Sequence, residues 1–586
     1  MLKQRMTRRG SALAAALIFF VVVTIAGTAL ITISGYHQVQ TVRNGLDVRL
    51  MIAAEAGIES VRGRFTVIPV IQEDWSALLP NPAPAWNNVG NFTINGISVD
   101  VDARSVGGPS VPTARVRSTA TSGNRWRTVE YTIKVASFSD YCVFNSGSGG
   151  STLGTNYKAV GNTYFGGNVS IPNPGAQLWG SSYMVGFVSP TYGAGNNGTT
   201  GQPWNPPPTS TAHFPVEPPQ QGQPAIPIPT WAAPWDALEA QAQSSTGHYW
   251  AENTIGIELI GTQYRRWYVR RKSAGTTPSG ENWLDLRSGI SVAPEVRFLN
   301  NATSITGGVA APNEVYEIAS QVYNIPNDSV IFVKTGSVAA VGPTVNGAAV
   351  TDALTGTNTW VQTTNWNNNT MVSTITNGVG TDREIVRNNG MPGQPYAKVL
   401  LLWGTLQGRR ISIGCDHKVI LADTIRYQAL LDNPQWRAFH GDGVNGKQSM
   451  GALGFVEMLG VMSKQDCMLT PTWWRPIPAA QAADTQVGEL IPTPHFPAAS
   501  FPMDGVFFSV YNTRPHRFRD QYVGQEFWGH GGLIAGGDYA AGMGNHFNRR
   551  NYDWDYRLAE TTPPYFLRAY NASATFINGS WRTYGS

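Results

Sequence analysis

The 586-residue sequence has few charged residues and only three cysteines, which excludes several classes of protein. Charged side chains make up 14% of the chain, and a formal net charge of +4 is too small to indicate a dedicated nucleic-acid binder. Cys142, Cys415 and Cys467 are far apart, so they offer no metal-binding spacing and at most one internal disulfide, with Cys142 pairing to either of the other two left open. A GxxxxGK[ST] phosphate loop is absent, which excludes a motor ATPase of that class.

The residues that are abundant favour a protein rich in β-strands. The hydrophobic fraction of 42% is ordinary for a chain with a packed core. Glycine is frequent, with 63 residues, and the sequence also holds 19 Trp and 22 Tyr. Aromatic residues favour strands and glycine favours turns, so this mixture predicts many strands with many turns. By length alone, the chain can hold roughly four domains.

The N-terminus combines a basic leader with a long uncharged run. Residues 1–10 form the leader, whose basic side chains are Lys3, Arg5, Arg8 and Arg9. No charged residue occurs from position 10 to position 42, and residues 12–33 are apolar apart from three threonines. A helix over 12–33 is about 33 Å long, which is enough to cross a bilayer. Because positive charge stays on the cytoplasmic side, the N-terminus is expected in the cytoplasm and the remainder outside.

Two kinds of export signal fit this run less well than a permanent helix does. A secretory signal peptide has a shorter apolar core, although Ala26 and Ala29 leave that option open. The pair Arg8–Arg9 occurs in twin-arginine signals, but the residues that follow do not fit the pattern. The apolar spacing instead continues into QTVRNGLDVRLMIAAEAGIESVRGRF, which predicts one helix over residues 11–65, about 80 Å long. Glu59 and Arg62 are expected on its solvated face.

The strings RRG, SALAAALIFFVVVTIAGTAL and AAEAGIE together resemble the N-terminus of type IV pilin-like proteins, specifically the PilX-type minor pilins. The resemblance covers about 65 residues and implies that prepilin peptidase cuts between Gly10 and Ser11. It also implies that the helix leaves the inner membrane to pack against the helices of other pilin-like subunits. The residues that it assigns to this transmembrane and assembly helix are Ala12, Ala15, Phe19, Val22, Gly27, Ile33, Glu55, Gly57 and Glu59.

The first and fifth residues after the expected cut depart from most major pilins, which carry Phe and Glu there. This chain has Ser11 and Ala15 instead. The missing Glu is shared with the K-type pseudopilins of type II secretion, which sit at the tip of a filament. An unpaired charge in lipid is costly, so the absence fits a position in which no neighbouring amine has to be neutralised.

A small antiparallel domain is predicted over residues 66–137. The segment NFTINGISVDVDARSV alternates about Asn95-Gly96, which is the strongest short signal for a hairpin. A second hairpin is predicted about Ser122-Gly123-Asn124. A long helix followed by a four-stranded meander is also the architecture that the pilin resemblance implies.

The rest of the chain reads as a mainly-β body. Short apolar segments bounded by Gly or Asn occupy residues 138–202 and recur through residues 301–586, which predicts the coils of a β-solenoid or β-helix. A β-sandwich is the alternative. Between them, residues 203–300 form a proline-rich segment and an insertion, with one short helix predicted in WDALEAQAQSS. The stretch near the C-terminus resembles the large β-rich domain that follows PilX-type N-termini in envelope proteins, whose function is undefined.

Several groups of potentially reactive side chains are better explained by structural roles. Asp553 and Asp555 flank Trp554 and could share a face, as in a glycosidase or calcium site, but pairing with nearby arginines is the simpler expectation. His530 and His546 lack further ligands with metal-site spacing. The Cys415-Asp416-His417 run cannot form a nucleophile on a strand, because neighbouring side chains point to opposite faces. No enzymatic activity, cofactor, metal or small-molecule substrate is therefore expected.

A basic and aromatic segment, TQYRRWYVRRKS, could contact DNA through phosphates and stacking. The candidate residues are Arg265, Arg266, Trp267, Arg270 and Arg271. A strand that carries alternating arginines is more often a solvated edge, so nucleic-acid binding is not the favoured interpretation.

Together with these patterns, the pilin resemblance implies a minor pilin or pseudopilin of a type IV pilus or a type II secretion-like filament. Its large body is expected at the tip or in the assembly-initiating complex, with a contribution to adhesion. Before assembly the protein would be a single-pass inner-membrane protein with its body in the periplasm or outside the cell. The alternatives are a membrane-anchored adhesin and a polysaccharide-acting β-helix enzyme.

Overall fold

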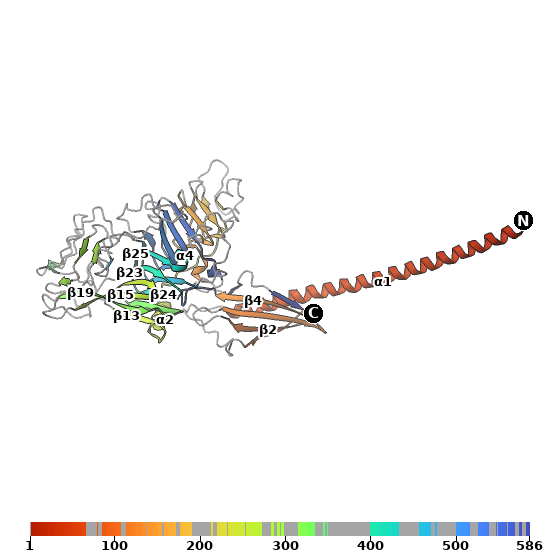
Figure 1. Cartoon of the computed structure of the whole chain (residues 1–586), viewed down its shortest axis with the longest axis horizontal. Coiled ribbons are helices and arrows are strands. Elements are labelled where there is room, and N and C mark those ends of the chain that lie inside the picture. Colours follow the sequence, from red (N-terminus) through yellow and green to blue (C-terminus); the bar gives the residue numbers. More distant parts are fainter. Residues whose placement is uncertain are drawn as a thin grey trace.

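The structure is a computed structural model. It describes residues 2–65, 79, 85–106, 113–135, 137–154, 157–171, 176–189, 213–214, 219–230, 232–251, 254–271, 283–285, 290–292, 295–297, 315–334, 344–345, 348–349, 399–432, 456–469, 475–476, 500–515, 526–537, 547, 549–559, 561–568, 574–576 and 582–585. Within these ranges, one long helix projects from a small sheet, and a large β-rich body lies beyond that sheet (Figure 1).

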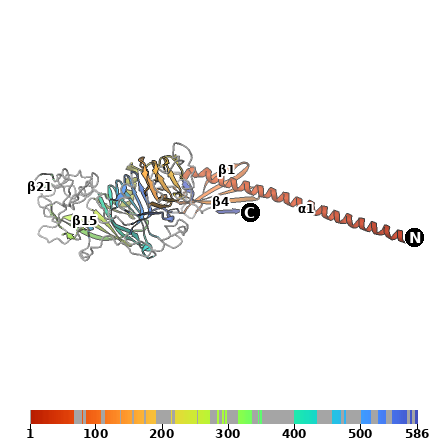
Figure 2. The ribbon, with the colours of Figure 1, turned by 90° about the horizontal axis from the view of Figure 1, so that it is seen from above.

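The predicted N-terminal helix is confirmed as α1, which runs unbroken through Leu2–Arg62 and ends in the 3-10 turn η1, Gly63–Phe65. Both views show its N-terminal part extending away from the remainder of the protein (Figures 1 and 2). Its C-terminal turns pack on protein, where Leu50, Ala54 and Ile58 are buried against the small sheet.

The predicted antiparallel meander is also confirmed. It comprises β1 (Asn87–Ile94), β2 (Ile97–Ser105), β3 (Thr113–Ser122) and β4 (Arg125–Val135), paired in chain order. Asn95 and Gly96 both have positive φ, 49° and 78°, which is the conformation of a two-residue type I′ hairpin. The second hairpin turns at Gly123-Asn124, with Gly123 at a φ of 62°. Alternate residues of β2 and β3 face α1 and form the core of this domain.

The C-terminus of the chain returns to the small sheet, which sequence analysis did not predict. Strands β33 (Ala574–Phe576) and β34 (Arg582–Gly585) both pair antiparallel with β4. Residues assigned by sequence to the C-terminal part, 301–586, therefore include two strands of the N-terminal domain. The large body is an insertion between β4 and β33.

The body is built mainly from parallel strand pairs. Its elements are β5 (Val143–Asn145), β6 (Ser151–Thr152), β7 (Tyr157–Val160), β8 (Thr163–Phe165), β9 (Val169–Ser170), β10 (Gln177–Trp179), β11 (Ser182–Met184), β12 (Val188–Ser189), α2 (Ala232–Gln243), β13 (His248–Ala251), β14 (Thr254–Gly261), β15 (Gln263–Arg271), β16 (Trp283–Asp285), β17 (Ile290–Val292), β18 (Glu295–Arg297), β19 (Val315–Asn324), β20 (Ser329–Lys334), β21 (Thr344–Val345), β22 (Ala348–Ala349), β23 (Val399–Leu406), β24 (Arg410–Cys415), β25 (Lys418–Tyr427), α4 (Gln428–Asp432), β26 (Met458–Ser463), β27 (Cys467–Leu469), β28 (Arg475–Pro476), β29 (Ser500–Ser509), β30 (Thr513–Pro515), β31 (Glu526–Ala535), β32 (Arg549–Asp553) and the 3-10 turn η8 (Tyr556–Ala559).

One parallel ladder runs through the body, and its spatial order differs from chain order. Its members in space are β13, β20, β24, β26, β29, β31, β5, β8 and β11. The first strand of the body, β5, thus pairs with β31 from its last part, through Val143 and Leu533. The chain enters in the middle of the ladder, builds one end, crosses to the other end and returns to where it began.

The coils at the β11 end are regular. Lys158 pairs with Gln177, Thr163 with Ser182 and Val169 with Val188, so each residue meets its partner 19 positions later in three different ladders. The proline-rich segment covers this end, where Gln220 accepts a hydrogen bond from Met184 and donates one to Ser182. The short helix predicted after that segment is confirmed as α2.

Candidate functional site: the projecting helix and its joint with the body

The projecting part of α1 exposes large apolar side chains in every direction. From Ala14 onward it is long and apolar enough to cross a membrane, and none of its most apolar stretch is buried in the protein. Of the residues that the pilin resemblance assigns to this segment, Phe19 is 71% exposed, Val22 is 56% and Ile33 is 54%. Such a surface requires lipid or other protein around it.

Three threonines in this segment satisfy their hydroxyls within the helix. The hydroxyl of Thr24 donates to the carbonyl oxygen of Phe20 at 2.8 Å, and those of Thr28 and Thr32 donate to carbonyl oxygens one turn earlier. Because each hydroxyl has an acceptor on its own helix, the segment can enter an apolar environment without an unpaired polar group.

Exposed apolar residues continue past the length that a bilayer covers. Tyr36, Val39 and Val42 are 50% to 72% exposed, and Val48 and Ile52 are exposed at the level of the small sheet. If residues 12–33 span about 30 Å of hydrocarbon, these side chains lie beyond it. This stretch, residues 36–52, is called the stalk below.

The C-terminal turns of α1 pack tightly against the small sheet. Gly57 is buried, and a Cβ at this position would meet Ser118 Oγ and Val99 Cγ1, the latter at 2.6 Å. Asp47 accepts hydrogen bonds from Arg125 and Arg127 of β4, each at 3.1 Å. Gly57, which the resemblance assigns to the assembly helix, therefore serves packing within the chain.

The two glutamates of the AAEAGIE string lie at the edge of this packed region. Glu59 pairs with Arg62 at 3.2 Å on the solvated face, as the spacing predicts. Partial burial raises the pKa of Tyr131 on β4, and the carboxylates of Glu55 and Glu59 add to that rise. The acidic side chains thus line the border between helix and sheet.

Gly10, Ser11 and Ala12 lie within α1, and their side chains are outside the described residues. Ala15 is exposed, and Gly27 has open space around it. Cleavage between Gly10 and Ser11 stays a prediction.

A second group of residues joins the small sheet to the body. Lys134 of β4 is buried, and its Nζ donates to Asp140 Oδ1 at 2.5 Å and to the carbonyl oxygen of Leu558 at 2.6 Å. Trp554 Nε1 donates to the carbonyl oxygen of Ser139 at 2.9 Å. Ser137 forms an antiparallel bridge with Arg568. Segments 134–140 and 554–568 are therefore held together where the chain enters and leaves the body.

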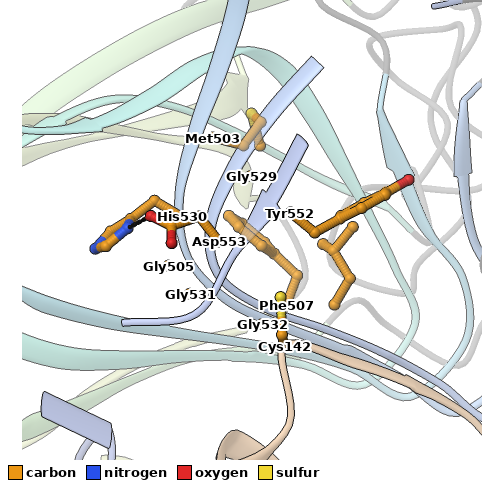
Figure 3. A pocket seen from close by; sticks show the side chains of 11 residues that line it. Cys142, Met503, Gly505, Phe507, Gly529, His530, Gly531, Gly532, Tyr552 and Asp553 are labelled. Atoms are coloured by element: carbon orange, nitrogen blue, oxygen red, sulfur yellow. Dashed lines mark hydrogen bonds and ion pairs between the residues drawn. The ribbon is translucent and has the colours of Figure 1, made fainter. Parts of the chain in front are cut away.

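A buried cluster of charged side chains lies next to this joint, because Arg557 of the cluster and Leu558 of the joint are neighbours in η8. His530 of β31 has its Nδ1 2.9 Å from Asp553 Oδ2 and its Nε2 3.7 Å from Asp555 Oδ2. Arg557 pairs with Asp555 through two nitrogens, with Nε 2.9 Å from Oδ1. Figure 3 shows His530 and Asp553 side by side at a small cavity that Cys142, Met503 and Tyr552 also line.

The ion pairs within this cluster shift the pKa values of its members. Burial by itself lowers the pKa of His530, but Asp553 and Asp555 outweigh it and raise the pKa to about 9. Burial works against the charge of Asp555 too, yet Arg557 and His530 hold the pKa of this carboxyl well below its usual range. Within this group, His530 thus pairs with Asp553 and Arg557 pairs with Asp555, so that opposite charges lie side by side in the interior.

This geometry does not form a nucleophile with its base. Both ring nitrogens of His530 face carboxylates, and burial raises the pKa of the Cys142 thiol well above its ordinary value, with a further rise from Asp553. The thiols of Cys415 and Cys467 are likewise buried with raised pKa values. All three cysteines are free. Among the residues that the structure describes, no group of three or more His, Cys, Asp or Glu side chains is arranged so that it could hold a metal ion, and His546 lies outside these residues.

Sequence analysis anticipated only part of the cluster. Asp555 pairs with an arginine as expected, but Asp553 instead pairs with His530, 23 residues earlier in the chain. Lys134 was not identified at all. A lysine in an alternating strand gives no signal of burial, because its acceptor on Leu558 is 424 residues away.

The basic and aromatic segment lies in β15, and the expectation that this strand is a solvated edge is wrong. It pairs with β14 on one side and β19 on the other. Trp267 is fully buried, its Nε1 donates to Glu258, and Arg265 pairs with the same carboxylate at 3.3 Å. Arg266 donates to Thr254 Oγ1 at 2.7 Å and lies over the ring of Trp250. The side chains of Arg270 and Arg271 are outside the described residues.

The described fold thus defines a protein with a long apolar N-terminal helix on an antiparallel sheet and a strand-rich body inserted into that sheet. No protein-family model matches the sequence, and no curated protein matches it. Among solved structures, the crystal structure of the competence-associated pilin ComZ from Thermus thermophilus is similar to this chain, with 9% sequence identity and a TM-score of 0.23. The alignment covers 92% of this chain and 97% of the ComZ chain.

Proposed function

We propose that this protein is a minor pilin or pseudopilin, held in the inner membrane by residues 12–33 and then transferred into a filament of a type IV pilus or type II secretion-like system. Its partners are prepilin peptidase, which cuts between Gly10 and Ser11, and the helices of other pilin-like subunits. The PilX-type resemblance of the N-terminal string supports this choice of family.

The main support for this proposal is the exposed apolar surface of the stalk. A plain membrane anchor needs about 20 apolar residues, after which polar residues suffice. In α1 the uncharged run extends from position 10 to 42, which is about 50 Å of helix. Beyond it, Val48 and Ile52 stay exposed at the level of the small sheet. A neighbouring helix packed along α1 would cover this whole length.

A position at the tip or in the initiating complex follows from two further features. Ala15 leaves the helix without the acidic residue that would pair with a neighbour's N-terminal amine. The inserted body occupies residues 138–568 and so is much larger than the small sheet that carries it. A contribution of this body to adhesion is part of the proposal.

We assign the body to the β-solenoid class, without enzymatic activity. The parallel ladders and the 19-residue offset between coils support a solenoid, because a sandwich of this kind pairs its strands antiparallel. Asp553 and Asp555, the carboxylates that a polysaccharide-cleaving enzyme would need, are both buried in ion pairs.

The test separates a filament subunit from an anchored protein. Val48→Glu with Ile52→Glu places charge on the stalk outside the lipid, so the variant should enter membranes and fold but be lost from filaments sheared from its host. Thr152→Glu, on an exposed position of the body, should leave filament incorporation unchanged. A wild-type protein found only with membranes, or a mature N-terminus beyond Ile33, would contradict the proposal.

A further inference from the structure

The body and the small sheet are connected twice at one place. The chain leaves β4 at Val135, enters the turn Phe138–Asp140, and returns 430 residues later through Arg568 to β33. Since β33 pairs with β4 itself, through Ala574 and Val135, the outgoing and returning segments belong to neighbouring strands. A domain tethered by one segment can swing, whereas two paired segments restrict rotation.

Side-chain hydrogen bonds connect these two segments to each other. Lys134, from the small sheet, binds one group on the outgoing segment, Asp140, and one on the returning segment, the carbonyl oxygen of Leu558. Asp140 is itself fixed, because its other carboxylate oxygen accepts the backbone N–H of Ser137 in a capping box. Burial makes these polar contacts costly to break.

The returning segment is in turn fixed to the ladder. The backbone N–H of Trp554 donates to Val160 of β7, and its indole donates to Ser139 on the outgoing segment. Arg557 binds Asp555, which faces His530 in the centre of β31. The contacts therefore run without a break from β4 through η8 to β31, so the charged cluster anchors the joint to the body.

We propose that this joint is a rigid coupling that fixes the orientation of the body relative to α1, with Lys134 and Trp554 as its two positioning residues. The inference does not depend on filament assembly. In a filament it would mean that the body is presented at one angle and that a load on it reaches the helix through two strands at once.

The experiment measures the distance between the small sheet and the body in the full-length protein in detergent. Spin labels are placed on Ser98→Cys in β2 and Thr152→Cys in β6, both exposed positions. The three native cysteines are buried, so we expect the spin label to attach at the two introduced cysteines. A single narrow distance distribution is expected for this labelled parent, and Lys134→Met should widen it about twofold by freeing the joint.

Trp554→Phe keeps an aromatic ring but removes the donor to Ser139, and it should also widen the distribution. Lys464→Met, which changes a half-buried lysine of the body away from the joint, is the matched control and should change nothing. A broad distribution in the labelled parent would overturn the proposal whether or not the variants fold. Unchanged narrow distributions in both joint variants, at unchanged melting temperature, would overturn the role given to these residues.

Discussion

Gly531 of β31 lies directly against Gly505 of β29, and both have positive φ, 126° and 139°. The two strands bend at these glycines, and each contributes to two ladders, one on either side of the bend. A Cβ on Gly531 would clash with the carbonyl oxygen of Gly505. The bend therefore requires glycine at both positions, because the φ angles are positive and because there is no room for a Cβ between the two strands.

Replacing Gly531 by alanine should destabilise the body strongly. The substitution combines an unfavourable φ with a backbone clash that no side-chain movement can relieve, so we expect a loss of about 3 kcal/mol or more. Thermal unfolding of the full-length protein, followed by tryptophan fluorescence, measures the effect. Gly149→Ala is the control, because its Cβ would have open space around it. Equal melting temperatures for the two variants would contradict this account of the bend.

The contact between α1 and the small sheet gives a second prediction. Gly57→Ala should destabilise the small domain by about 1–3 kcal/mol, since its Cβ would press on Ser118 and Val99. Gly45→Ala lies on the same helix in open space and should stabilise the helix by about 0.5–1 kcal/mol. Thermal unfolding in detergent should therefore move in opposite directions for the two variants. The same direction for both would show that Gly57 does not set the helix–sheet distance.

Local patterns were enough to predict the elements of the N-terminal domain. The spacing of Leu50, Ala54 and Ile58 identifies the buried face of α1, and Asn95-Gly96 identifies the first turn. Each of these signals lies within a few residues of the structure it specifies. The same holds for α2, whose pattern of Trp235, Leu238 and Ala242 is buried in the body.

Long-range pairing was not predictable from local patterns. Nothing near Val143 indicates that it pairs with Leu533, or that Ala574 returns to Val135. Parallel strands cannot be joined by a short hairpin and need a crossover connection of about a dozen residues or more, so their order in space carries no local signal. The error at β15 has the same origin, because the strand that covers its second edge is β19, where Arg265 pairs with Val322 far along the chain.

The returning strands give a third prediction. Removal of residues 574–586 takes away β33 and β34 and exposes the edge of β4, which should accelerate hydrogen exchange at the β4 amides that pair with them. Amides of β2, which lies between β1 and β3, serve as the internal control and should change less. Unchanged protection along β4 would show that the two C-terminal strands do not stay paired in solution.

The buried charged cluster makes stability depend on pH. The pKa of His530 is raised from 6.5 to about 9 in the folded protein, so its contribution is fully present below pH 6.5 and is lost as the pH rises through 9. The pKa of Asp555 is lowered, so its contribution is present above its ordinary pKa and is lost on acidification. The cluster therefore stabilises the body most between about pH 5 and pH 7.

Replacing His530 by glutamine should cost about 3–5 kcal/mol at pH 6, because Asp553 loses a buried partner of opposite charge. The cost should shrink by pH 10, where the wild-type imidazole is neutral as well. Melting temperatures of both proteins at the two pH values measure this difference and cancel the titration of other groups. His248→Gln, measured at the same two pH values, is the control, since burial lowers the pKa of His248 and its contribution should change much less between pH 6 and pH 10. A cost for His530→Gln that stays constant from pH 6 to pH 10 would show that the ring is neutral in the native cluster.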